Sequence, residues 1–199
     1  MAKGFQDLHR IARLFNHIEQ LKSPNKQELI LKSATICSLL VVNDVDQLQI
    51  EAGTLSYIPQ YVAWSQEGIN NHFGADVGKL IREVEKIRKM FLGDEADEDD
   101  ARKFTFQAKN IYLHQCFLDT LHIYDLPDAS ITVDGVNYVT EDDKVFSNGE
   151  WLERQVFHQW ILELLVWKLE MLAYEGVIVQ NIEQLVENYK VQKGYILEK

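Results

Sequence analysis

The sequence predicts a mainly α-helical fold with one small β-hairpin. Apolar residues recur every three or four positions along most of the 199 residues, which is the spacing of one face of a helix. One segment, residues 130–142, instead carries alternating apolar residues around a central Asp-Gly pair, as a hairpin with a tight primed turn does. We therefore expect a single compact domain over residues 1–199.

Three helices are expected in the first 57 residues. The apolar positions of the first run from Phe5 to Leu21, and the Ser-Pro-Asn that follows ends it. The second covers about residues 27–42 and the third about residues 46–57. Asp44 or Asp46 is available to cap the exposed amide groups of the third helix.

The middle of the chain adds three more helices. Pro59 lacks an N–H donor, so the third helix should end or kink before it. A short helix is expected over residues 65–73, and Gly74 suits the left-handed turn that closes it. Amphipathic helices follow over about residues 76–90 and 101–124, and the acidic stretch between them is expected to be a solvated loop.

Two C-terminal helices are expected over residues 149–191, the last of them over about 179–191. The longer one stacks Trp160, Leu164, Trp167, Met171 and Tyr174 on one face, and Phe157, Ile161, Leu165, Leu169 and Leu172 on the adjacent face. Such a helix is either buried on both sides or shared with a second subunit, so a homodimer through Trp160 and Trp167 stays open.

The charge and apolar composition of the chain limit the classes of partner that it can bind. The 20 basic residues against 31 acidic ones give a net charge of -11, which argues against a groove for nucleic acid. The same charge would suit a basic protein partner, or would simply keep the chain soluble. No apolar run approaches the roughly 20 residues that cross a bilayer, so we expect no membrane span and a cytoplasmic location. Cys37 and Cys116 lie in apolar helical patterns, where buried thiols are expected.

Residues 28–125 resemble the HD hydrolase domain of the RelA/SpoT family, and above all its stand-alone small alarmone hydrolases. The ungapped framework matches are Ala52, Leu55, Ser65, Glu67, Ile69, Phe73, Gly74, Val77, Leu80, Val84, Lys86 and Ile87. Downstream, residues 116–123 match with Asp119, Leu121 and His122 in register, and residues 153–160 do so loosely. The resemblance implies an HD-like helical bundle, to which the hairpin at 130–142 is an addition.

The same resemblance implies that the metal site is lost. HD enzymes hold a divalent cation with an early His, an adjacent His-Asp pair and a later Asp, and the cation activates water. In register, the early His falls near Leu31, the His-Asp pair falls on Ser56 and Tyr57, and only Asp119 remains. One carboxylate does not hold a catalytic metal.

The other catalytic positions are changed too. The Glu-Asp pair that assists the attacking water falls on Gln60 and Tyr61, neither of which is a carboxylate base. A shifted metal site around Asp119 would need His72, His114 or His122. His114 and His122 lie eight residues apart on one helix, more than two turns, so both do not readily bind one ion with Asp119 between them.

These substitutions favour a catalytically inactive pseudoenzyme that works by binding a protein partner or a nucleotide, in a regulatory or antitoxin-like role. Its vestigial pocket would involve Ser56, Tyr57, Gln60, Tyr61, Asp119 and His122. That pocket is either collapsed by the tyrosine rings or open to a nucleotide by stacking. No metal or other cofactor is expected. The alternative is a manganese-dependent pyrophosphohydrolase, acting on alarmones or other nucleotides through a rearranged site.

Overall fold

The computed structural model describes residues 3–92, 101–125, 130–133, 136–141, 144–147 and 149–176. Two compact units divide the chain: unit 1 comprises residues 1–95 and 103–114, and unit 2 comprises residues 96–102 and 115–199. The expected mainly helical fold with a small hairpin is confirmed. The single domain over residues 1–199 stays a prediction.

The first three helices form as the apolar spacing predicts: α1 spans Lys3–Gln20, α2 spans Lys26–Val42 and α3 spans Gln47–Leu55. Of the two candidate caps for α3, the structure uses Asp46, whose carboxylate accepts the Gln49 N–H at 2.8 Å. Helix α3 ends three residues before Ile58, the residue that Pro59 restrains, and a single turn, α4 (Ile58–Tyr61), follows.

Helix α5 (Gln66–Phe73) begins and ends as expected. The Ser65 hydroxyl accepts the Gly68 N–H at 3.0 Å, and Gly74 closes the helix with a φ of 99°. This left-handed conformation favours glycine because a side chain there would be strained. Helix α6 (Ala75–Leu92) starts directly after it, so Gly74 sets the angle between the two helices.

The helix expected over 101–124 is interrupted. Residues 101 and 102 are helical, residues 103–105 are not, and α8 runs from Phe106 to Asp125. Thr105 explains the break, because its hydroxyl accepts the Ala108 N–H at 3.3 Å and donates to Glu83 at 2.6 Å. A threonine that caps a new helix competes with continuing the old one.

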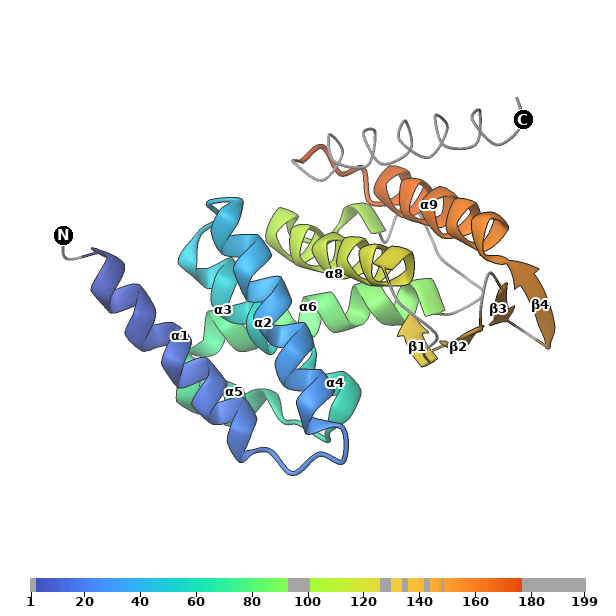
Figure 1. Ribbon diagram of the computed structural model, residues 1–199. Coiled ribbons are helices and arrows are strands. Elements are labelled where there is room, and N and C mark those ends of the chain that lie inside the picture. Colours follow the sequence, from blue (N-terminus) through green and yellow to red (C-terminus); the bar gives the residue numbers. More distant parts are fainter. Residues whose placement is uncertain are drawn as a thin grey trace. The chain divides into compact units, whose positions relative to one another are not determined.

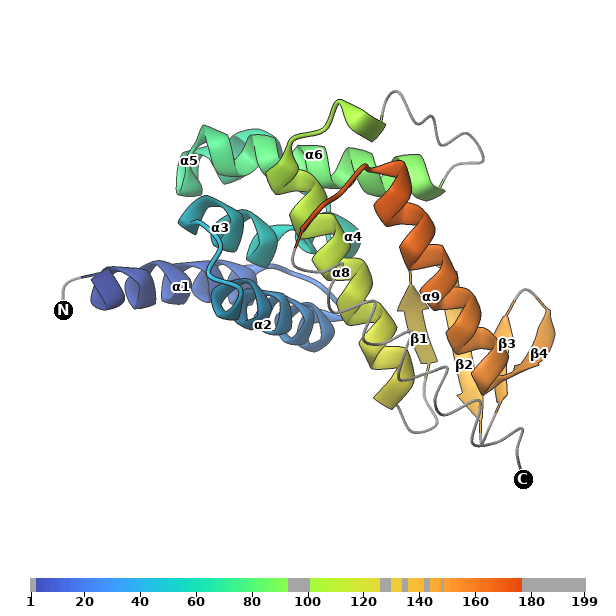
Figure 2. The same cartoon turned by 90° about the horizontal axis from the view of Figure 1, so that it is seen from above.

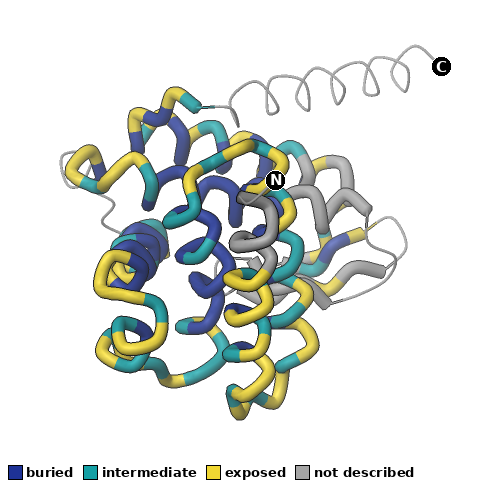
Figure 3. The backbone as a smooth tube through the Cα atoms, turned by 90° about the vertical axis from the view of Figure 1, so that its left-hand side faces the viewer, coloured by how far each residue is buried: buried dark blue, intermediate teal, exposed yellow. Residues whose placement is uncertain are grey.

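Helix α3 lies at the centre of unit 1, in contact with α1, α2 and α6. Figure 1 labels these helices. Figure 2 shows that α3 lies between two pairs of helices, with α1 and α2 on one side and α5 and α6 on the other. Gly53 permits this close packing, because a Cβ there would clash with the Leu40 side chain and also reach Ile111. In Figure 3 the buried positions form the inner side of these helices and the exposed positions their outer side.

Unit 2 contains an antiparallel sheet in the order β1-β2-β3-β4. Strands β1 (Ser130–Val133) and β2 (Val136–Glu141) are the expected hairpin, with Val133 paired to Val136. Its Asp-Gly turn lies outside the described residues. Two further strands, β3 (Lys144–Ser147) and β4 (Glu150–Glu153), were not expected.

The long C-terminal helix therefore starts later than the expected residue 149: α9 spans Arg154–Met171 and follows β4 without a loop. Ser147 pairs with Glu150, and Gly149 just before Glu150 has a φ of 89°; the sequence between the two strands is Asn-Gly, of which Asn148 lies outside the described residues. Asn-Gly is the strongest short hairpin signal, and here it decides against a helix. The helix expected over 179–191 and the acidic stretch 93–100 lie outside the described residues.

Candidate functional site

The position that the resemblance assigns to the His-Asp pair is packed core in unit 1. Ser56 and Tyr57 are each only 1% exposed. The Ser56 hydroxyl donates to the Gly53 carbonyl at 2.6 Å, which occupies its one proton. Leu31, near the position of the early His, points the other way and is 57% exposed.

Two cations surround this position. Arg88 on α6 is buried and donates to the Ser56 carbonyl at 3.3 Å, a favourable place for a cation because α3 ends there. The Lys32 ammonium lies 5.5 Å from the centre of the Tyr57 ring. Glu28 lies 3.9 Å from the Lys32 ammonium and offsets part of its charge. Neither a serine hydroxyl that already donates to a carbonyl nor a phenol supplies the imidazole and carboxylate ligands of an HD metal site.

The other expected pocket residues are divided between the units. Gln60 is exposed on α4, and the Tyr61 hydroxyl donates to Glu28 on α2 at 2.8 Å. Asp119 is buried on α8 in unit 2. His122 is also on α8, and its side chain is outside the described set. A pocket shared by all six residues stays a prediction.

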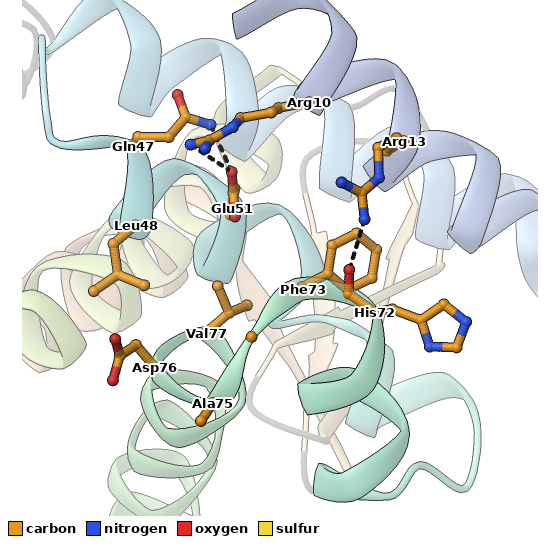
Figure 4. A pocket seen from close by; sticks show the side chains of 11 residues that line it. Arg10, Arg13, Gln47, Leu48, Glu51, His72, Phe73, Ala75, Asp76 and Val77 are labelled. Carbon is orange, nitrogen blue, oxygen red and sulfur yellow. Dashed lines mark hydrogen bonds and ion pairs between the residues drawn. The ribbon is translucent and has the colours of Figure 1, made fainter. Parts of the chain in front are cut away.

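A cavity of about 320 Å³ opens elsewhere in unit 1, and we call it the arginine pocket. Its lining comes from α1, α3 and the α5–α6 junction: Arg10, Arg13, Gln47, Leu48, Glu51, His72, Phe73, Gly74, Ala75, Asp76 and Val77. Figure 4 shows that these side chains come from separate helices, with Arg10 directed at Glu51 and Arg13 at the His72 carbonyl. Leu48, Phe73 and Val77 give it an apolar wall beside the charged groups.

Helix α1 supplies both arginines. Arg10 and Arg13 are three residues apart, so they share one face of α1. Arg10 is 57% exposed and lies 3.5 Å from the Glu51 carboxylate, whereas Arg13 donates to the His72 carbonyl at 2.7 Å. The Arg13 guanidinium also lies 5.8 Å from the centre of the Phe73 ring. These contacts hold both cations over the pocket.

The opposite side of the pocket is the start of α6. Asp76 lies in its first turn and is exposed, where the helix dipole favours a carboxylate. Gly74 and Ala75 present little side-chain bulk at this edge. The pocket thus carries both signs of charge: the two guanidinium groups come from α1, the Glu51 carboxylate on α3 lies beside Arg10, and the Asp76 carboxylate comes from α6 (Figure 4).

A pair of histidines borders the pocket. The His17 and His72 rings lie 5.2 Å apart, and the His17 ring meets Phe73 edge-on at 5.2 Å. Burial, and then the neighbouring His72, lower the pKa of His17 below its usual range. Protonating this pair beside Arg13 would gather positive charge between α1 and α5.

His114, one of the histidines considered for a rescued metal site, belongs to a buried polar network in unit 1. Its Nδ1 lies 2.7 Å from the Asn110 carbonyl, so it must donate there, and its Nε2 accepts from the Asn43 amide at 3.2 Å. Asn110 in turn donates to Gln49 at 2.7 Å. Burial lowers the pKa of His114, against the opposing effect of the Asn110 bond. Both ring nitrogens are engaged, so this imidazole serves the fold.

The arginine pocket was not expected from the sequence. Its one local signal is the three-residue spacing of Arg10 and Arg13, which any exposed helix face also shows. Within the described part of the chain, no three His, Cys, Asp or Glu side chains gather in a group able to hold a metal ion. Over the same residues, no helix is both long enough and apolar enough to cross a bilayer.

Comparisons with models of protein families, with curated proteins and with solved structures each found no match to this chain.

Proposed function

We propose that this chain is a non-catalytic protein of HD-like fold that binds a small phosphorylated ligand, best a nucleotide, in the arginine pocket. We place it in the cytoplasm, in a regulatory role. The observation that carries the proposal is the convergence of two arginines and an apolar wall on one cavity of about 320 Å³. That volume lies within the range of about 300–1,000 Å³ in which small-molecule sites fall.

The arginines would hold the phosphate. A guanidinium presents five N–H donors in a planar fork that matches phosphate oxygens. Arg13 uses one nitrogen on the His72 carbonyl and Arg10 makes only a long contact with Glu51. Donors therefore remain on both side chains, and an incoming phosphate would compete with Glu51 for Arg10.

The pocket residues other than the two arginines suit the base and the sugar of a nucleotide. Phe73, Leu48 and Val77 offer apolar surface to a base or a sugar, and aromatic rings stack on bases. Asp76 and Gln47 offer acceptor oxygens to hydroxyl or amino groups. A free inorganic phosphate would use the arginines alone, so it should bind more weakly than a nucleotide.

Binding without turnover is supported by the packing of Ser56 and Tyr57. Both are buried, and neither supplies an imidazole or carboxylate ligand to a divalent cation. The proposals that the chain has an HD-like fold and that it is catalytically inactive rest on the resemblance of its sequence to HD hydrolase domains. We derive no metal-dependent step for this position.

Isothermal titration calorimetry with guanosine tetraphosphate, GTP, AMP and inorganic pyrophosphate tests the proposal. We expect at least one nucleotide to bind, and Arg13→Gln or Arg10→Gln to weaken it about tenfold, since hydrogen bonds to charged groups contribute about 1.5–3 kcal/mol. The matched control is Arg82→Gln on α6, because Arg82 contacts Gln66 and does not line the pocket. No heat at millimolar nucleotide, or an equal loss in the control, would refute the pocket.

A phosphate-release assay with manganese addresses the alternative. We expect no turnover of guanosine tetraphosphate with or without the ion. Turnover that requires manganese, together with bound metal in elemental analysis, would replace the binding proposal with the pyrophosphohydrolase.

A further inference from the structure

Unit 2 exposes its tryptophans. Trp151, Trp160 and Trp167, three of the four in the chain, are 47%, 42% and 40% exposed. Tryptophan is usually well buried, and exposed aromatic groups are enriched where proteins bind one another. This surface is separate from the arginine pocket, which lies in unit 1.

Two of these tryptophans lie on one stripe of α9. Val156, Trp160 and Trp167 follow one another at four and seven residues, which is one face of a helix, and Val156 is 56% exposed. The opposite face already supplies the core, since Phe157, Ile161 and Leu165 are at most 3% exposed. Each residue of the stripe keeps 40% or more of its surface exposed, so the stripe is far less buried than the opposite face.

The charges beside the stripe are acidic. Glu163 is three residues after Trp160 and four before Trp167, and Glu170 is three residues after Trp167, so both border the tryptophans. Both glutamates are exposed, whereas Lys168 on the same helix is buried at 3%. The whole chain carries a net charge of -11.

The acidic residues beside the stripe favour a basic partner over a second copy of this chain. A second copy of the stripe would bring its own Glu163 and Glu170 toward the same residues, and like charges across an interface are unfavourable. A partner with Lys or Arg beside apolar residues would instead pair with the glutamates. Its cations would also be attracted to the faces of the indole rings.

We propose that the α9 stripe, made of Val156, Trp160 and Trp167 with Glu163 and Glu170, docks a basic amphipathic segment of a partner protein. The two tryptophans are the anchors, because Trp is enriched among residues that dominate binding energy. The glutamates set the sign of the partner and speed its association, so binding weakens as salt is added.

The probe is a dye-labelled amphipathic peptide of leucine and lysine, about 15 residues long so that it can form a helix. Its counterpart has glutamate at every lysine position. Fluorescence anisotropy with the full chain should show binding of the lysine peptide only. Trp160→Ala and Trp167→Ala should each weaken it about tenfold, and Trp151→Ala, which removes an equally exposed tryptophan outside α9, should leave it within about twofold.

Charge reversal gives a test that does not depend on removing a large side chain. Glu163 and Glu170 are exposed, so the double variant Glu163→Lys with Glu170→Lys should fold, as circular dichroism would verify. We expect it to lose the lysine peptide and gain the glutamate peptide.

Three results would overturn the proposal. One is equal binding of the two peptides, or of neither at millimolar concentration. Another is a loss in Trp151→Ala as large as in Trp160→Ala. The third is a dimer in sedimentation experiments that Trp160→Ala abolishes, which would make a second copy the occupant of the stripe.

Discussion

Two tyrosines of unit 1 and three tryptophans of unit 2 differ in how far they are buried. In unit 1, Tyr57 and Tyr112 are 1% exposed and belong to the core. In unit 2, Trp151, Trp160 and Trp167 keep 40% or more of their surface exposed. Large aromatic side chains that fill a core stabilise the fold, whereas exposed ones are available to a partner. Within α9 itself, Phe157 is 0% exposed and Trp160 is 42% exposed, so an aromatic residue's place on the helix decides whether it serves the core.

Polar residues show the reverse contrast. Unit 1 buries a connected set of amide and imidazole groups, in which Asn110 donates to Gln49 and His114 bonds to Asn43. On α9 of unit 2, the carboxylates of Glu163 and Glu170 are at the surface. A satisfied buried network fixes how helices meet, while surface carboxylates act on what approaches.

The sharpest test of the aromatic contrast truncates one ring in each unit. Tyr57→Ala should lower the free energy of unfolding by about 3–5 kcal/mol, as loss of a fully buried aromatic ring does. Trp160→Ala should lower it by about 1 kcal/mol, because much of its ring is already in water. Urea unfolding followed by circular dichroism measures both. Equal losses would remove the contrast between the two units.

The next largest loss of stability is expected from a substitution at Gly53, where the helices of unit 1 pack closely. Gly53→Ala should cost about 1–3 kcal/mol, because the new methyl group would clash with Leu40 and press toward Ile111. The control is Ser38→Ala on the exposed face of α2, which loses only a bond to its own helix and should stay within about 0.5 kcal/mol. A neutral Gly53→Ala would mean that α2 and α3 separate easily.

The buried histidines predict a dependence on pH. The pKa values of His114 and His17 are lowered in the folded state, so the unfolded chain binds protons first as pH falls. Stability is then full above the unfolded pKa of about 6.5 and is lost as pH falls below it. Urea midpoints between about pH 7.5 and pH 5.5 should decline, and His114→Gln should flatten that decline. If the urea midpoint of His114→Gln falls with pH as steeply as that of the original chain, groups other than His114 cause the pH dependence.

The smallest change in stability is expected from removing an exposed ion pair on α6. Lys89 and Glu85 are 2.7 Å apart on α6, but the Lys89 side chain is 72% exposed. Lys89→Ala should therefore change stability by no more than about 0.5 kcal/mol, and salt should reduce even that. A loss comparable to that of Gly53→Ala would show that this pair does more than its exposure suggests.

Local signals in the sequence predicted much of the fold. Asp46 and Ser65 cap helices because each carboxylate or hydroxyl reaches an amide three residues ahead. Gly74 closes α5 for an equally local reason. Strand β4 was not predicted because the apolar residues after Asn148 also fit a helical face, and β3 was not predicted without the partner strand β4.

The candidate sites depended on longer-range contacts. Tyr57 was expected in a vestigial pocket, and its burial with Lys32 over the ring is decided by α2. Trp160 and Trp167 were expected on one helical face, and the structure added that each keeps 40% or more of its surface exposed. The carboxylates beside them became informative only once their exposure was known.

The sequence by itself determined α1, α2, α3, α5 and α6, the Ser65 cap and the first hairpin, because hydrogen bonds and apolar spacing within a few residues settle such features. The tertiary structure decided where a pocket opens. The Arg13 guanidinium meets a carbonyl 59 residues away, and Arg10 meets Glu51 on another helix. Contacts of that separation depend on how whole helices pack, since no local pattern of residues encodes the distance between two helices.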